Sequence, residues 1–288
     1  MDTLPNTWLA PAKINLFLHI NNKRSDGYHH LQTIFQLLDY YDVLSFALRT
    51  DGNIRRSSGN DDVPESEDLI IRAAQALKQA TGTCLGADVS VVKNIPAGGG
   101  LGGGSSNAAT TLIALNQLWQ TQCCQQQLMQ IGLSLGADVP VFVNGLSAWA
   151  EGVGELLTPM VLPAHYFLVV SINKSVSTRR IFSHQALTTT PRIGKISQLS
   201  SLDNTHNDCL AAAVALEGEI LVVLDHLKLS KNCLYQPRMT GTGSCVFAAF
   251  KDEKDALVAL KKVPKQWGGF VAKAINTSPI LKWAVAKR

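Results

Sequence analysis

Apolar residues recur along this chain with two different periods, which together predict a mixture of strands and helices. Alternating or β-branched apolar positions predict strands at 9–20, 31–48, 87–95, 148–157 and 165–172. Apolar positions three and four residues apart predict helices at 68–80, 108–119, 125–135, 208–215 and 219–229. Pro140 is suited to the first turn of a further, short helix.

Polar segments rich in Gly, Ser, Asn or Pro separate these elements. Residues 51–67 and 175–182 are expected to be loops, and residues 183–206 are rich in Ser and Thr and weakly patterned. Two prolines, Pro159 and Pro163, lie just before the apolar strand predicted at 165–172, so a domain boundary is expected near 159–163. The length suits one large domain or two moderate ones.

The stretch 96–111, PAGGGLGGGSSNAATT, is the most distinctive in the chain. It holds six glycines within seven positions and lies between a predicted strand and a predicted helix. Glycine lets the main chain approach a phosphate closely, and the N-terminus of the following helix favours negative charge. Between residues 89 and 137 the only charged side chain is Lys93. We therefore expect this loop to bind an anion such as a polyphosphate.

Other interpretations of the glycine loop fit the sequence less well. A flexible linker is often rich in Gly and Ser, but it rarely connects a strand to an apolar-faced helix. Gly98, Gly100 and Gly103 match the dinucleotide-binding fingerprint, yet no acidic residue follows before Asp138. The Gly-Lys-Ser/Thr of a P-loop is also missing. The loop is therefore expected to bind phosphate in a third way.

Composition narrows the classes of function further. The chain is 46% hydrophobic and 17% charged, with a net charge of +4 that suits anionic small substrates but without the clustered Lys and Arg of nucleic-acid-binding proteins. No apolar run reaches membrane-spanning length, and the N-terminus resembles no signal peptide. The six cysteines lack zinc-ligand spacing. A cytoplasmic enzyme that binds neither nucleic acid nor membrane is expected.

Three polar residues are candidates for chemistry. Lys13 and Asn15 share one face of the first predicted strand and could project into a site, although that face could instead be solvated. Asp138 follows a glycine turn and could act on a substrate, but capping the next short helix is the commonest role of Asp at such a place.

Two further segments could bind a ligand. Tyr28 and His29 follow a Ser-Asp-Gly turn and could stack on and hydrogen-bond a planar ring, or could lie in a solvated loop. A metal site is not expected there, because the adjacent side chains of His29 and His30 point apart. The second glycine loop, in 239–250, is either a binding loop or a tight turn before an apolar strand.

In combination, these motifs resemble those of the GHMP kinases, small-molecule kinases that include galactokinase, homoserine kinase and mevalonate kinase. The segments occur in the expected order over nearly the whole chain: PAKINLFLHI, DGYHHLQT, PAGGGLGGGSSNAA, LGADVPVF, AEGVGE, HNDC and TGTGSCVFA. The middle glycine loop is the signal of the superfamily. PAKINLFL with DGYH narrows the resemblance to the branch that acts on a cytidine diphosphate sugar alcohol of the non-mevalonate isoprenoid pathway.

The resemblance implies an α+β fold with two domains and a central cleft. Residues 1–158 would form an ATP-binding domain like domain 2 of ribosomal protein S5. Residues 159–288 would form a substrate-side domain, a ferredoxin-like α/β sandwich. The resemblance gives no oligomeric state, and a monomer or weak homodimer is expected.

The resemblance also assigns roles to individual residues. Lys13 and Asp138 would be the catalytic pair. The ATP phosphates would be bound by Lys93, Pro96, Ala97, Gly98, Gly99, Gly100, Leu101, Gly102, Gly103, Gly104, Ser105 and Ser106. The substrate would be bound by Asn15, Tyr28, His29, Thr178, Phe182, Thr240, Gly241, Thr242 and Gly243. Among these, Tyr28 and Phe182 would sandwich the cytosine ring while His29 hydrogen-bonds its edge.

The implied reaction is transfer of the γ-phosphoryl group of ATP to the 2-hydroxyl of the methylerythritol unit. MgATP would be the co-substrate, with Ser106 near the magnesium ion, and no metal would be permanently bound. Another GHMP-type kinase, for a homoserine- or mevalonate-like substrate, and a catalytically silent nucleotide-binding regulator are the alternatives. The chain has Asp68 where the family pattern has Asn, so the resemblance does not carry over a contact from this position to adenine. Residues 183–204 match the family pattern only loosely, and no role is assigned to them.

Overall fold

The computed structural model describes residues 6–25, 27–61, 63–194 and 202–284. The strands are β1 Trp8–Lys23, β2 His29–Arg49, β3 Ile54–Ser58, β4 Gly86–Val92, β5 Ala148–Glu151, β6 Leu156–Pro159, β7 Tyr166–Ser171, β8 Arg238–Met239, β9 Val246–Phe250 and β10 Gly268–Ile275. The helices are α1 Leu69–Thr81, α2 Gly103–Leu118, α3 Gln125–Leu135, α4 Val139–Asn144, α5 Thr178–Phe182, α6 Leu210–Leu216, α7 Glu219–Lys228, α8 Glu253–Leu260 and α9 Leu281–Ala284, with a 3-10 turn at Leu202–Asn204. The α+β class expected from the sequence is confirmed.

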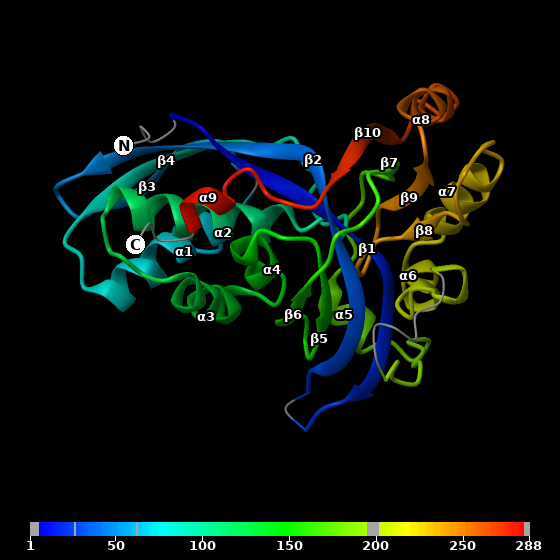
Figure 1. Cartoon of the computed structure of the whole chain (residues 1–288), viewed down its shortest axis with the longest axis horizontal. Helices are drawn as coiled ribbons and strands as arrows, with labels where there is room; N and C mark the ends of the chain where they lie inside the picture. Colours follow the sequence, from blue (N-terminus) through cyan, green and yellow to red (C-terminus); the bar gives the residue numbers. More distant parts are fainter. Residues whose placement is uncertain (1–5, 26, 62, 195–201, 285–288) are drawn as a thin grey trace.

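Within the described residues the strands form a ten-stranded sheet that runs through the whole molecule (Figure 1). Its main path is β3-β4-β2-β10-β7-β9-β8, while β1 and β5 also pair with β2, and β6 pairs with β5. The contact between β2 and β10 is short, because only Leu37 and Leu38 of β2 pair with Ile275 and Ala274. This short contact joins the two halves of the sheet.

Helices cover the two halves separately. In Figure 1, α1 to α4 lie against one half and α6 to α8 against the other. Each half has its own apolar core, and a third cluster, which includes Ile14, Phe167 and Phe247, fills the region between them. The last helix, α9, returns to the N-terminal half, where the rings of Trp8 and Trp283 are 5.8 Å apart. The boundary at 159–163 therefore stays a prediction, and the chain crosses between the halves more than once.

The long strand β1 is buried on both faces from Ala10 to Ile20. Lys13 and Asn15 are only 2% and 3% exposed, so the alternative of a solvated face is wrong. A β-bulge between Asn15 and Leu18 interrupts the pairing with β2 and the strict alternation of faces. Both polar side chains are therefore held in the interior of the protein.

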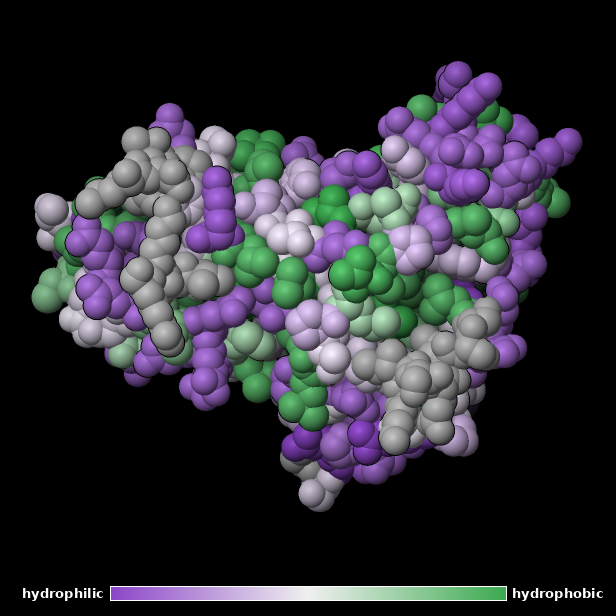
Figure 2. Space-filling model, in the orientation of Figure 1, coloured by the Kyte–Doolittle hydropathy of each residue, from purple (hydrophilic) through white to green (hydrophobic). Residues whose placement is uncertain are grey.

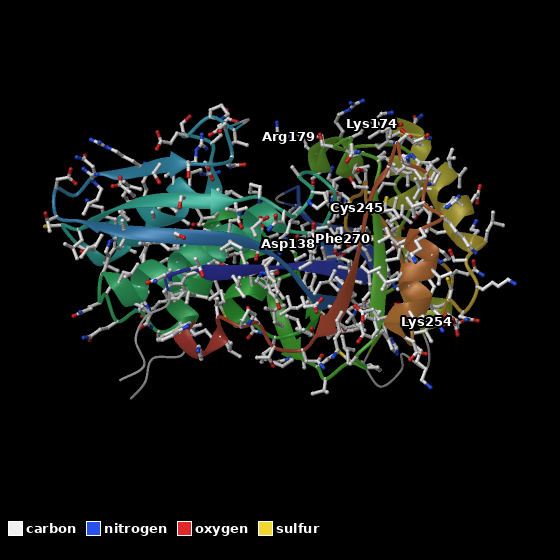
Figure 3. All side chains as sticks on the ribbon, turned by 90° about the horizontal axis from the view of Figure 1, so that it is seen from above. Asp138, Lys174, Arg179, Cys245, Lys254 and Phe270 are labelled. Carbon is white, nitrogen blue, oxygen red and sulfur yellow. The ribbon has the colours of Figure 1, made fainter. Side chains whose placement is uncertain are left out.

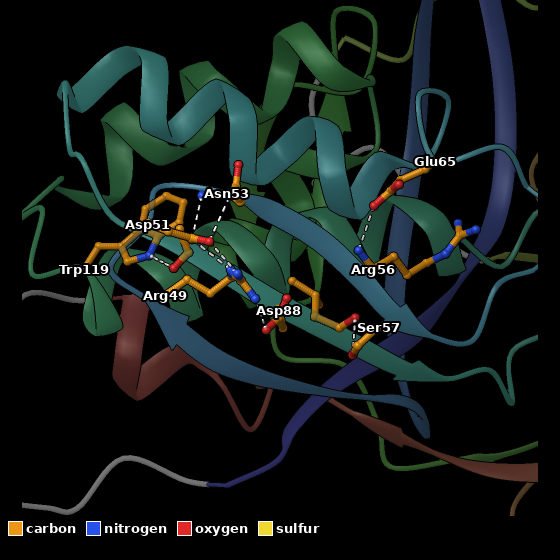
Figure 4. Close-up of polar contacts among 10 residues, drawn as sticks. Arg49, Asp51, Asn53, Arg56, Ser57, Glu65, Asp88 and Trp119 are labelled. Atoms are coloured by element: carbon orange, nitrogen blue, oxygen red, sulfur yellow. Dashed lines mark hydrogen bonds and ion pairs between the residues drawn. The ribbon is translucent and has the colours of Figure 1, made fainter.

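The segment 51–67, expected to be a loop, contains the edge strand β3. Its polar sequence hid it, because an exposed edge strand needs no apolar face. β3 pairs in parallel with β4, and Figure 4 shows the side-chain contacts beside it. The Ser57 hydroxyl donates to the carbonyl oxygen of Val89 at 3.1 Å, and the amide of Arg56 donates to Glu65 at 2.8 Å.

Two further expectations need correction. Residues 175–182 were expected to be a loop, but α5 forms there because fully buried Ile181 packs into the C-terminal core. One short turn of helix whose two apolar residues, Ile181 and Phe182, are adjacent shows no period. The single strand expected at 148–157 is the antiparallel pair β5 and β6, which glycine turns separate.

Most helix predictions are confirmed, and their ends have local causes. The Asp68 carboxylate caps α1 by accepting from the amide of Ile70 at 2.9 Å, and Gly82 ends the helix in a left-handed conformation. Figure 2 shows hydrophilic side chains gathered over α8, which turns Ala256 and Ala259 to the core.

None of the helices in the described ranges is long and apolar enough to cross a membrane. Of the weakly patterned segment 183–206, residues 195–201 lie outside the described residues.

Candidate active site

The predicted site residues gather around one cleft of about 970 Å³. Its lining includes nearly all of them: Lys13, Asn15, Tyr28, His29, Lys93, residues 96–105, Asp138, Thr178, Phe182, Gly241, Thr242 and Gly243. Ser106 and Thr240 do not line it, and both are fully buried behind it. Figure 3 shows Asp138 where the two halves of the molecule meet.

Lys13 and Asp138 form an ion pair in this cleft, with 3.2 Å between the Lys13 Nζ and the Asp138 Oδ2. The ammonium group also donates to the Asn15 Oδ1 at 2.6 Å and to the Gly100 carbonyl oxygen at 2.9 Å. Asp138 occupies the N-cap position of α4, but its side chain makes no capping bond. The carboxylate, 36% exposed, instead lies beside Lys13 and remains accessible from the cleft.

The glycine loop connects β4 to α2 and is packed tightly against the second glycine loop. Gly100 has a φ of +78°, and a Cβ there would lie 2.2 Å from the carbonyl oxygen of Thr240. Only glycine fits at this close approach of two backbones. The Thr240 hydroxyl donates to the Gly100 carbonyl oxygen at 3.2 Å and accepts from the Asn15 amide at 2.9 Å. The strand carrying Lys13 and the two loops are thus held together.

The first turn of α2 carries no acidic residue, as a phosphate-binding helix start requires. Two of its side-chain oxygens, Ser106 Oγ and Asn107 Oδ1, are buried and make no hydrogen bond within the described residues. Asn107 also lines the cleft and was missed by the sequence analysis, because it lies just beyond the glycines. Either oxygen is chemically suited to coordinate a magnesium ion, and the Ser106 hydroxyl can also donate to a phosphate oxygen.

Lys93 is fixed by Asp42, a fully buried carboxylate of β2. The second contact of Asp42 is to the backbone, where its Oδ1 accepts from the amides of Asn94 and Ile95 at 2.7 and 2.9 Å. Asp42 therefore holds the chain immediately before the glycine loop. Its signal in the sequence is an acid within an apolar strand, but Asp39 shares that signal, so the sequence could not single it out.

The predicted ring clamp lies at another part of the cleft. The rings of His29 and Phe182 stack with centroids 5.2 Å apart and an interplanar angle of 22°. Tyr28 is 63% exposed beside them. Burial, and secondarily the charge of Lys23, lowers the pKa of His29 below its usual value. The sandwich between Tyr28 and Phe182 stays a prediction, since here it is His29 that stacks on Phe182.

Asp68, where the chain departs from the family pattern, is committed to the protein. Besides capping α1, its carboxylate accepts from Arg56 at 2.7 Å and from Asn60 at 2.9 Å, and the residue is 2% exposed. Both oxygens therefore already have partners. Within the described residues, no group of three His, Cys, Asp or Glu side chains is arranged to hold a metal ion.

Comparisons with known proteins identify relatives of this chain. Residues 68–146 match the GHMP kinases N terminal domain. The chain is 65% identical to the 4-diphosphocytidyl-2-C-methyl-D-erythritol kinase of Ruthia magnifica subsp. Calyptogena magnifica, over 99% of this chain and 100% of that one.

Solved structures are similar over the same length. A crystal structure of 4-(cytidine 5'-diphospho)-2C-methyl-D-erythritol kinase superposes with a TM-score of 0.80 and 30% identity, over 93% of this chain and 98% of that one. Homoserine kinase from Cytophaga hutchinsonii superposes with a TM-score of 0.68 at 16% identity, over 96% and 97% of the two chains, and so shares the fold.

Proposed function

This chain belongs to the 4-diphosphocytidyl-2-C-methyl-D-erythritol kinase family, and we propose from this premise that it phosphorylates the 2-hydroxyl of that substrate. The phosphoryl donor is ATP, the products are the 2-phosphate and ADP, and the reaction belongs to the non-mevalonate isoprenoid pathway. The observation that carries the proposal is the ion pair between Lys13 and Asp138 beside the glycine loop.

In the proposed reaction, Asp138 accepts the proton of the 2-hydroxyl. The oxygen attacks the γ-phosphorus in line, the bond from this phosphorus to the β–γ bridging oxygen breaks, and ADP leaves with that electron pair. The Lys13 ammonium, 3.2 Å from Asp138, stabilises negative charge on the attacking oxygen. Since phosphoryl transfer depends mainly on positioning and charge stabilisation, a pair fixed by Asn15 and Gly100 suits the reaction.

For ATP, we propose binding along the glycine loop, 96–106, with its amides directed at the phosphates. Lys93 supplies a positive charge at the edge of the cleft, held in place by Asp42. Asn107 lines the same wall. Ser106 is the side chain proposed to lie near the magnesium ion that would accompany ATP, and this ion would supply positive charge against the phosphates.

For the cytidine substrate, we propose that Tyr28, His29 and Phe182 bind the base, because flat rings offer stacking surfaces. Asn15, Gly241, Thr242 and Gly243 would bind the sugar-alcohol end near Asp138, whereas Thr240, buried behind the cleft, would position this loop through its bonds to Gly100 and Asn15. Thr178 joins this loop to α5 through a hydroxyl contact of 3.0 Å with Thr242. The substrate would thus extend from the rings to the catalytic pair.

A coupled ADP-release assay tests the function. The cytidine diphosphate methylerythritol substrate is expected to give turnover, whereas homoserine and mevalonate give none above the background of ATP alone. Turnover with homoserine or mevalonate instead would assign the chain to another branch. No turnover with any alcohol, together with measurable ATP binding, would favour the nucleotide-binding regulator.

We further propose that the enzyme works in the cytoplasm, since its proposed substrates are small, water-soluble anions, and that it is a monomer or weak homodimer. Size-exclusion chromatography with light scattering measures the oligomeric state, and a stable higher oligomer at micromolar concentration would contradict it.

A further inference from the structure

Two cations from different elements flank the stacked rings of His29 and Phe182. Lys23, the last residue of β1, is the register partner of His29 in β2. Arg179 lies three residues before Phe182 in α5. All four residues line the cleft, and both cations are exposed. The end of the cleft that holds the rings therefore carries two positive charges.

The packing of α5 decides which of its two arginines reaches the cleft. Fully buried Ile181 turns one side of the helix into the C-terminal core. Residues three and four apart on a helix share a face. Arg179 shares its face with Phe182 and lines the cleft, whereas Arg180, although also exposed, does not. In Figure 3, Arg179 lies where the two halves of the molecule meet, as Asp138 does.

Most other charges along the cleft are already paired. Lys13 pairs with Asp138, Lys93 pairs with Asp42, and Asp68 pairs with Arg56. By contrast, neither Lys23 nor Arg179 forms an ion pair with another described residue. These are the cleft cations left over for a ligand.

The remaining charged groups do not cancel them. Glu67 lines the cleft beside Asp68, in the segment that leads into α1, and is not part of the ring clamp. The pKa of His29 is lowered by burial and by Lys23, so this ring adds no charge near neutral pH. Counted over the residues that the structure describes, the ring end of the cleft therefore carries more positive than negative charge, which suits an anion.

We propose that Arg179, together with Lys23 in the same cleft, binds the diphosphate of the cytidine substrate and thereby selects a nucleoside diphosphate over an uncharged nucleoside. This inference rests on the proposed function, in which the base lies at the rings and the reacting hydroxyl at Asp138, so the diphosphate must lie between. A guanidinium presents two parallel N–H donors to phosphate oxygens. Lys23 contributes a second, less directional charge.

The test measures binding of CDP and of cytidine by calorimetry to the wild type and to the Arg179→Ala, Arg179→Lys and Arg180→Ala variants. The wild type and Arg180→Ala are expected to prefer CDP to cytidine by the same factor. Arg179→Ala should lose about tenfold of this preference, the size of one charge-assisted contact, with little change in cytidine affinity. Arg179→Lys should lose less. Raised salt should reduce the preference for CDP over cytidine more in the wild type than in the Arg179→Ala variant.

Kinetics supply the second readout. Arg179→Ala should raise KM for the cytidine substrate by about tenfold, with kcat and KM for ATP nearly unchanged. An unchanged preference for CDP in Arg179→Ala, or an equal loss of CDP and cytidine affinity, would overturn the proposal. If the wild type bound CDP but turned over no cytidine substrate, the proposed function would fail instead. The two failures are therefore distinguishable.

Discussion

The ammonium of Lys13 donates to the carbonyl oxygen of Gly100 at 2.9 Å, and this bond ties the proposed catalytic pair to the glycine loop. Lys13 also contacts Asp138, so one buried cation connects a backbone turn, a strand and a helix start. Positions of the proposed base and of the ATP phosphates are consequently linked. Mutation of Asp138 should nevertheless act mainly on kcat, whereas mutation of the glycine loop should act mainly on KM for ATP.

Replacing Asp138 with Asn should lower kcat by about two orders of magnitude or more, because the group that accepts the proton is lost. ATP binding should be nearly unchanged, since the glycine loop is intact. Turnover with the cytidine substrate and ATP binding by calorimetry check this. Asp225→Asn, a change of the same type on the exposed side of α7, is the control. A kcat close to that of the wild type would remove Asp138 from the role of base.

Replacing Tyr28 with Ala should raise KM for the cytidine substrate far more than KM for ATP. Stacking of an aromatic side chain on a base contributes about 1–3 kcal/mol, which corresponds to about fivefold to more than a hundredfold in KM. The two KM values of this variant and of Phe182→Ala are measured together. Equal effects on both substrates would count against the ring clamp.

Position 99 is expected to need glycine because the side chain of Cys245 leaves no space for a Cβ atom. A Cβ at position 99 would lie 2.3 Å from the Cys245 Sγ but 3.5 Å from its Cβ. Gly99→Ala should therefore displace the loop and raise KM for ATP by about tenfold, in line with an overpacking cost of 1–3 kcal/mol.

The double variant Gly99→Ala with Cys245→Ala removes the clashing sulfur and should recover most of the ATP affinity. Cys245→Ala alone provides the matched control. Failure of the double variant to recover would mean that position 99 must be glycine for contact with the phosphates themselves.

Asp42→Asn should lower stability and weaken ATP binding together. The remaining oxygen of the neutral side chain can still accept from both backbone amides, but its NH2 group then faces the Lys93 ammonium, which loses its partner and is repelled. We expect a loss of about 1–3 kcal/mol in the free energy of unfolding, with raised KM for ATP. Urea unfolding and steady-state kinetics measure the two effects. Asp39→Asn, at an exposed carboxylate of the same strand, should change neither.

The free energy of unfolding should fall in mild acid because of His19. Burial, then His206, lowers its pKa to about 4, against the raising effect of Asp208, and Arg238 adds to the lowering. The unfolded chain binds a proton below about pH 6.5 and the folded protein only below about pH 4, so acid favours unfolding between these values. Between pH 7 and pH 5 this group should cost about 2 kcal/mol.

His19→Gln tests this by removing the titrating ring. Urea unfolding of the variant should show a smaller loss of stability from pH 7 to pH 5 than the wild type. Parallel pH dependences in the two proteins would assign the acid sensitivity to other groups.

Much of the local structure follows from the sequence. The helices at 68–80 and 125–135 and the strands at 9–20 and 165–172 carry clear periods and lie where they were predicted. The elements that the sequence hides are short or exposed. β3 has no apolar face, and α5 has one turn with only Ile181 buried, so their existence depends on what they pack against.

The candidate site divides in the same way. The glycine run could be selected from its own composition and its place between a strand and a helix. Lys13 and Asp138 each had an ordinary structural interpretation as well, and the family resemblance singled them out. The sequence could not select Asp42 or Arg179. An acid within a strand and an arginine in a polar segment are common, and only the fold brings the first to Lys93 and the second to the ring clamp.

The sequence by itself determined most of the helices and strands, the glycine loop and the family resemblance, because these depend on neighbouring residues and on spacing. Only the tertiary structure decided that Lys13 lies 3.2 Å from Asp138, that Asp138 does not cap its helix, and that Arg179 rather than Arg180 lines the cleft. The physical reason is that short-range periodicity sets local conformation, whereas side-chain partners are set by packing between segments far apart in the chain.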